Sequence, residues 1–93
     1  MEDMEMEAVK KINMEKRKNL MTSLIDILLR SGNAAKLPSA TANLILHYWQ
    51  HDKLTSDEGF QKLLEAAYTI EPEQTIELLN NAGLSEVVEE LKK

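Results

Sequence analysis

The sequence predicts an all-α protein, a compact array of four to five short helices with a charged, partly flexible N-terminal extension. After residue 19, apolar residues recur every three or four positions, the spacing of a helix face, in each successive segment. No stretch of useful length alternates between apolar and polar residues as a strand would. At 93 residues and 43% hydrophobic content, the chain supports a single core. We therefore assign residues 1–18 to the extension and residues 19–93 to one helical domain.

The N-terminal extension is rich in charge but has no continuous apolar face. Residues 1–18 contain five acidic and five basic side chains, with the acids mostly first, an order that suits a helix dipole. Lys10, Asn13 and Arg17 fall in the angular sector that the residues after Leu20 use for the core. We therefore expect a tail or a frayed helical extension, with the buried stripe beginning near Leu20.

Two helices are expected in the first half of the domain. Residues 20–29 are apolar over about 200° of the helix circumference, which predicts a heavily buried helix. Gly32 is expected to end this helix in the left-handed conformation. Residues 39–51 form the next helix, since Pro38 prevents continuation from before and Ser39 is a suitable N-cap.

Three further helices are expected in the second half. The segment "TSDE" is typical of a capping box, with Thr55 as N-cap and Glu58 as its partner, before a helix with a clean apolar face. Pro72 suits the first position of the following helix, and Gly83 is expected to end it. A last short helix is predicted from Ser85.

The segment "HYWQHD" at residues 47–52 contains the most distinctive chemistry of the chain. His47 and His51 are four residues apart, the spacing with which zinc peptidases bind metal. The sequence has neither the catalytic glutamate of that motif nor any cysteine or further histidine. We expect a solvent-facing histidine pair on the polar side of the helix, with no metal site and no cofactor.

Tyr48 and Trp49 lie on the apolar side of the same helix and are the candidate partner-binding residues, because aromatic side chains dominate interface energetics. In a chain with so few aromatic residues, a wide apolar arc more often buries them in its own core. We expect the core for Trp49. For Tyr48, core and surface remain equally open.

The charge distribution weighs against independent nucleic-acid binding. Lys16, Arg17 and Lys18 form a basic cluster that would contact phosphate if the protein bound DNA. However, residues 55–93 contain nine acidic and three basic side chains, and the net charge of the whole chain is −5. This acidic half repels phosphate and favours a basic protein surface.

Several classes of protein have no support in the sequence. There is no glycine-rich phosphate loop, no cysteine and no serine in a nucleophile-elbow context, so no catalytic residue is predicted and the chain is not expected to be an enzyme. The longest apolar run, residues 24–29, is too short to cross a bilayer. Without a signal-peptide pattern, a cytoplasmic location is expected.

The segments "LPSATANLILHYWQHDKL" and "GFQKLLEAAYTIEPEQTIELLNNAGLSEVVEELKK" resemble a small accessory subunit of the crenarchaeal family-B replicative DNA polymerase. The resemblance extends over most of the chain and contains no signature motif. It implies a non-catalytic helical protein that binds the polymerase catalytic subunit together with another small subunit, modulates synthesis and strand displacement, and meets DNA only within the complex. No site residue is implied by it.

Two alternatives remain open. The first is a stand-alone, dimeric DNA-binding regulator that uses the basic cluster and the helices around Trp49. The second is structural: the apolar arcs of the helices at 20–29 and 39–51 exceed what a small helical array needs to bury, which would suit a homodimer interface.

Overall fold

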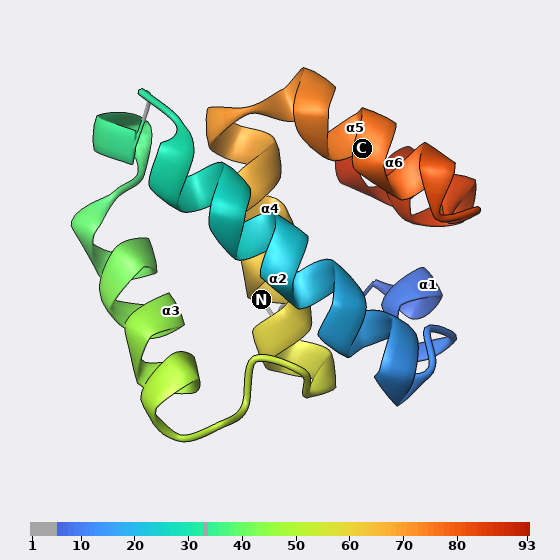
Figure 1. Ribbon diagram of the computed structural model, residues 1–93, viewed down its shortest axis with the longest axis horizontal. Helices are drawn as coiled ribbons and strands as arrows, with labels where there is room; N and C mark the ends of the chain where they lie inside the picture. Colours follow the sequence, from blue (N-terminus) through green and yellow to red (C-terminus); the bar gives the residue numbers. More distant parts are fainter. Residues whose placement is uncertain (1–5, 33) are drawn as a thin grey trace.

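The computed structural model describes residues 6–32 and 34–93, and this part of the chain is all-α, with no strand (Figure 1). Its elements are α1 (Glu7–Lys10), α2 (Met14–Arg30), the 3₁₀ turn η1 (Ala34–Lys36), α3 (Ser39–Gln50), α4 (Asp57–Ile70), α5 (Pro72–Asn81) and α6 (Ser85–Lys92). The sequence predicts four to five helices; α1 is the additional one. The radius of gyration is 12.1 Å, as expected for a single compact domain of this length.

α4 is the central helix. It packs most extensively on α2 and also contacts α1, α3 and α5. Phe60, Leu63, Leu64 and Ala67 are fully buried, and they recur at the spacing of one helix face. Because four helices pack on this one, α4 fixes the positions of the others.

The N-terminal segment differs from the expected tail. Met6, Ala8, Val9 and Ile12 are buried in the hydrophobic core, where α1 packs on α4 and α6. α2 begins at Met14, well before Leu20, and the side chain of Asn13 caps it by accepting a hydrogen bond from the backbone N–H of Lys16 at 2.8 Å. The core therefore includes residues from position 6 on, so the expected tail is wrong for residues 6–18, and residues 1–5 lie outside the described part.

The N-terminus of α4 is capped one residue later than predicted. Ser56 is the N-cap: its hydroxyl accepts a hydrogen bond from the N–H of Gly59 at 3.0 Å and donates one to the carbonyl of Lys53 at 2.7 Å. The predicted box between Thr55 and Glu58 is wrong. Glu58 instead accepts a hydrogen bond from the Tyr48 hydroxyl at 3.2 Å, which ties α4 to α3.

Of the other predicted helix ends, the later ones are confirmed and the earlier ones are wrong. Pro72 begins α5, and Gly83 follows it with φ +75°, in the left-handed conformation. Gly32 does not have a positive φ: α2 ends at Arg30, and the backbone of its C-cap residue, Ser31, is already extended. Ser39 is the first residue of α3 rather than its cap, which leaves this helix without a side-chain cap at its N-terminus.

Thr75 of α5 gives a prediction about the core. Its side chain is fully buried, and its hydroxyl has no hydrogen-bond partner among the described residues. A buried hydroxyl without a partner costs about 1–3 kcal/mol in lost hydration. Thr75→Val, which removes the hydroxyl and keeps the shape, is expected to stabilise the protein by about 1 kcal/mol, or roughly 4–8 °C in Tm, measured by thermal denaturation.

Thr69→Val is the matched control for this substitution. The Thr69 hydroxyl is exposed and donates to the carbonyl of Glu65 at 2.8 Å, so its removal is expected to change stability by less than about 0.5 kcal/mol. A loss of stability in Thr75→Val would mean that the hydroxyl has a partner, such as a buried water.

Candidate protein-binding face

α3 is the least covered helix of the domain. Its composition is more apolar than that of α2, α4, α5 or α6, yet none of its twelve residues, all of which the structure describes, is buried. It lies at the edge of the molecule and is held mainly by α4 (Figure 1). An apolar helix without a buried residue is typical of a surface that a partner covers.

One side of α3 packs on the core and the adjacent side does not. Leu44, Ile45 and Tyr48 are half-buried, and Ile45 and Tyr48 pack against the core cluster. Leu46 and Trp49, about 100° further round the helix, are 53% and 54% exposed. The expectation that Trp49 belongs to the core is therefore wrong: the apolar arc is wider than the contact with α4, and Trp49 is on the part left over.

Trp49 borders a hollow between α3 and α2. This hollow has a volume of about 530 Å³. It is lined by Lys18, Met21, Thr22, Trp49, Asp52, Leu54 and Thr55. Met21 and the buried Leu54 supply apolar lining beside the indole. The hollow thus combines an exposed aromatic side chain with apolar contact area next to it, which is the composition of a binding hot spot.

We use the name Trp49 face for this hollow and the residues that continue it along α2 and α3. On α2, the row of residues that lines the hollow continues toward the helix C-terminus at a spacing of three or four positions. It ends at Leu29, which is 80% exposed. The Trp49 face consists of the hollow together with Ile25 and Leu29 of α2 and Ala42 and Leu46 of α3.

The turn after α3 holds Asp52 beside Trp49. Asp52 has φ +58°, a conformation that aspartate tolerates better than most residues. The N–H of Lys53 donates to the carbonyl of Tyr48 at 2.7 Å, and the N–H of Asp52 donates to the carbonyl of Trp49 at 3.1 Å. These two bonds are those of a Schellman motif, and they place a carboxylate at the rim of the face.

Tyr48 lies on a different side of α3 from Trp49. It lines a separate hollow with His47, Lys53 and Glu58. The two aromatic residues predicted as partner-binding candidates are therefore not part of one surface. Of the pair, Trp49 is the one exposed beside α2.

The basic cluster Lys16, Arg17 and Lys18 is divided among three directions. Lys16 donates from its ammonium group to the carbonyl of Ala82 at 3.1 Å, at the C-terminus of α5. Arg17 is only 6% exposed. Lys18 is exposed and borders the Trp49 face. Because neighbouring residues on a helix point about 100° apart, the cluster is contiguous in sequence but does not form a basic patch.

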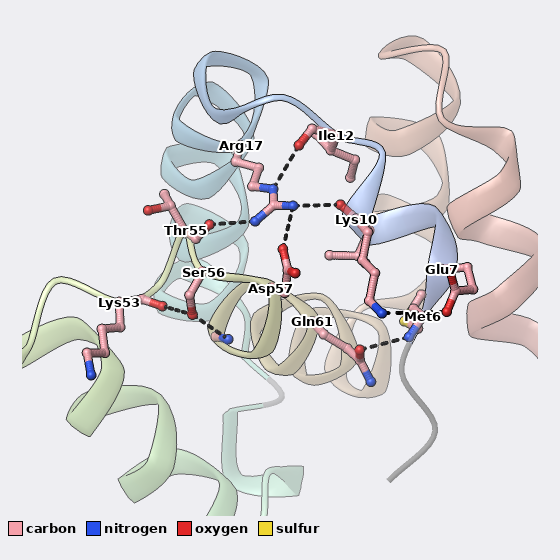
Figure 2. A network of polar contacts seen from close by, with 12 residues as sticks. Met6, Glu7, Lys10, Ile12, Arg17, Lys53, Thr55, Ser56, Asp57 and Gln61 are labelled. Atoms are coloured by element: carbon pink, nitrogen blue, oxygen red, sulfur yellow. Dashed lines mark hydrogen bonds and ion pairs between the residues drawn. The ribbon is translucent and has the colours of Figure 1, made fainter.

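Arg17 is a structural residue. Its guanidinium donates to the backbone carbonyls of Val9 at 2.9 Å, Ile12 at 2.9 Å and Thr55 at 2.7 Å, and forms an ion pair with Asp57 at 2.7 Å (Figure 2). These contacts join the α1–α2 segment to the start of α4. With its donors directed at carbonyl oxygens inside the protein, Arg17 is not available to bind phosphate, and its assignment to a nucleic-acid site does not agree with the structure.

His47 and His51 are both exposed, as predicted, with ring centroids 4.4 Å apart. In the part of the chain that the structure describes, no group of three or more His, Cys, Asp or Glu side chains is arranged to hold a metal ion. None of the described helices is both long and apolar enough to span a bilayer.

Comparisons with protein-family models, with curated proteins and with solved structures found no match for this chain.

Proposed function

We propose that this protein is a non-catalytic protein-interaction subunit that binds its partner through the Trp49 face. The observation that supports this most is the uncovered apolar side of α3, where Leu46 and Trp49 are half-exposed beside a hollow. Aromatic anchors next to an apolar hollow carry most of the binding energy in protein interfaces. The charged rim, with Lys18 and Asp52, supplies orientation rather than affinity.

The partner we propose is the catalytic subunit of a family-B replicative DNA polymerase, in a complex with another small subunit, in the cytoplasm of an archaeal cell. The resemblance of the chain to such accessory subunits supports this choice. The acidic half of the chain is suited to a DNA-binding enzyme, because such enzymes have basic surfaces. In such a complex the protein modulates synthesis and strand displacement and meets DNA only indirectly.

A stand-alone DNA-binding regulator is the second reading, and the described contacts favour it less. Of its three basic candidates, Lys16 is bonded to the end of α5 and Arg17 is buried, which leaves Lys18. Phosphate binding by one lysine gives little affinity, and the acidic half opposes it.

The test is a binding measurement between the purified protein and the purified polymerase catalytic subunit of the same organism. Trp49→Ala is expected to weaken binding by about 2 kcal/mol, roughly 30-fold in Kd, because it removes the central anchor of the face. Because Trp49 is 54% exposed in the single chain, the substitution is expected to leave the Tm of the monomer nearly unchanged. A binding assay with the polymerase immobilised on a sensor surface gives the Kd, and thermal denaturation followed by circular dichroism gives the Tm.

Gln74→Ala, at an exposed position of α5, is the matched control and is expected to bind like the wild type. Salt-dependent binding of duplex DNA by the isolated protein, together with no binding of the polymerase, would contradict the proposal and support the regulator. If the wild type and Trp49→Ala bind the polymerase equally, the protein is still a polymerase subunit, but the Trp49 face is not its contact surface.

A further inference from the structure

The Trp49 face contains both an exposed aromatic side chain and a recess. Trp49 is 54% exposed and also lines the hollow. A two-fold axis that relates two copies of the face places the indole of each copy at the hollow of the other. The indole of one copy would then contact Met21 and Leu54 of the other and lose most of its exposure.

The charged residues at the rim of the hollow are also suited to a two-fold contact. Lys18 borders the hollow from α2, and Asp52 borders it from the turn after α3. A two-fold axis through the hollow exchanges the two sides, so that Lys18 of one copy faces Asp52 of the other. Unlike charges that meet in this way fix the register of a contact.

The remaining charge of the chain permits this contact. Residues 19–54 contain two acidic and three basic side chains, and two of them, Asp26 and Arg30, already pair at 2.7 Å. The charged residues of the face itself are Lys18 and Asp52, which balance each other, so the face is close to neutral. The strongly acidic α5 and α6 lie on the other side of the molecule from α3 (Figure 1), so two copies joined at this face keep their acidic surfaces apart.

We infer that in the free protein the Trp49 face binds a second copy of this chain, in a two-fold homodimer with Trp49 at its centre. A polymerase that docks on the same face must displace the second copy, so the two contacts are alternatives. The inference concerns the isolated protein, and its test requires no polymerase. Failure of one proposal is thus distinguishable from failure of the other.

The experiment follows molar mass and tryptophan emission of the isolated chain from about 1 μM to about 1 mM, a range that covers weak and moderate dimers. The mass is expected to rise from the monomer value of 10.6 kDa toward twice that value. Trp49 is the only tryptophan in the sequence, so its emission reports on this face alone and is expected to shift to the blue over the same concentrations.

Leu46→Lys is expected to weaken the dimer by at least about 30-fold, because it places a charge within the contact, one helical turn from Trp49. Gln74→Lys adds the same charge on α5, away from the face, and is expected to dimerise like the wild type. If Leu46→Lys does not fold, Leu29→Lys replaces it, since Leu29 is 80% exposed and contributes little to the core.

Two results would overturn the inference. One is a mass of 10.6 kDa at every concentration. The other is a dimer that Leu46→Lys leaves intact, or whose formation does not change the emission of Trp49, because such a dimer would form through another surface.

Discussion

Arg17→Met is expected to destabilise the protein by about 3–5 kcal/mol, because it removes a buried guanidinium that donates three hydrogen bonds to backbone carbonyls. The substitution removes the guanidinium donor from the carbonyls of Ile12 and Thr55, and leaves the Val9 carbonyl with only the backbone N–H of Ile12. Since domains of this size have stabilities near the lower end of 5–15 kcal/mol, the variant is expected to be largely unfolded at elevated temperature. Urea denaturation followed by circular dichroism measures the change.

Arg30→Met is the matched control for Arg17→Met. Arg30 is also ion-paired, with Asp26 of the preceding turn, but both side chains are exposed, so its replacement is expected to cost less than about 0.5 kcal/mol. Arg17→Lys retains the charge but not the planar fork that reaches three carbonyls, and is expected to lie between the two. Equal stability of Arg17→Met and Arg30→Met would disprove the structural role of the guanidinium.

Gly59→Ala is expected to destabilise the protein by about 2–3 kcal/mol, although the same change in an ordinary helix stabilises by about 1 kcal/mol. A Cβ atom at position 59 overlaps the backbone carbonyl oxygen of Lys53 and lies 3.1 Å from the Ser56 hydroxyl. Both atoms belong to the capping turn of α4, so the turn must open to admit the methyl group. Thermal denaturation of the wild type and the variant measures the change in Tm, and a lower Tm is expected for the variant.

Gly32→Ala provides the comparison for Gly59→Ala. A Cβ at position 32 meets no heavy atom within 4 Å, and the backbone there is not in the left-handed region. Its replacement is expected to be neutral or to stabilise slightly, by lowering the conformational entropy of the unfolded chain. A stabilising Gly59→Ala would mean that the turn around Lys53 and Ser56 is looser than the structure indicates.

The fold class was predictable because helix periodicity is a local property. The apolar faces of α4, α5 and α6 appear in the sequence at the correct spacing, and Pro72 and Gly83 mark boundaries through their own backbone preferences. Caps were less predictable where neighbouring residues had similar side chains. Thr55 and Ser56 both carry a hydroxyl, and only the path of the preceding turn, fixed by the Lys53 carbonyl, selects Ser56.

The expected tail rests on three polar residues in the apolar sector, Lys10, Asn13 and Arg17, and Arg17 is the one that the structure buries. This residue lies in the same sector as Leu20 and Leu24, and a charged residue in an apolar stripe ordinarily marks the end of a buried face. Here the charge is satisfied inside the protein, mostly by backbone carbonyls: those of Val9 and Ile12 from the segment just before α2, and that of Thr55 from a distant part of the chain. Backbone acceptors have no sequence signature, so the pattern alone does not distinguish a buried arginine from the end of a helix.

The exposure of Trp49 was unpredictable for a related reason. Periodicity gives the width of the apolar arc of α3, but not how much of that arc the neighbouring helices cover. Only α4 covers it extensively, and the part directed toward α2 stays open. The excess width of the arc was visible in the sequence; its position on the molecule was not.

The sparse packing of α3 has a consequence for the dynamics of the free protein. Local opening of a helix costs least where few buried contacts are lost, and α3 has no buried residue while α4 has many. α3 is therefore the helix expected to separate first from the rest, leaving the contacts of α4 with α2 and α5 in place. A partner that closes over α3 raises the free energy of this opening, because it binds only the docked helix. Binding affinity and the rigidity of α3 are then linked quantities, and a change in either one changes the other.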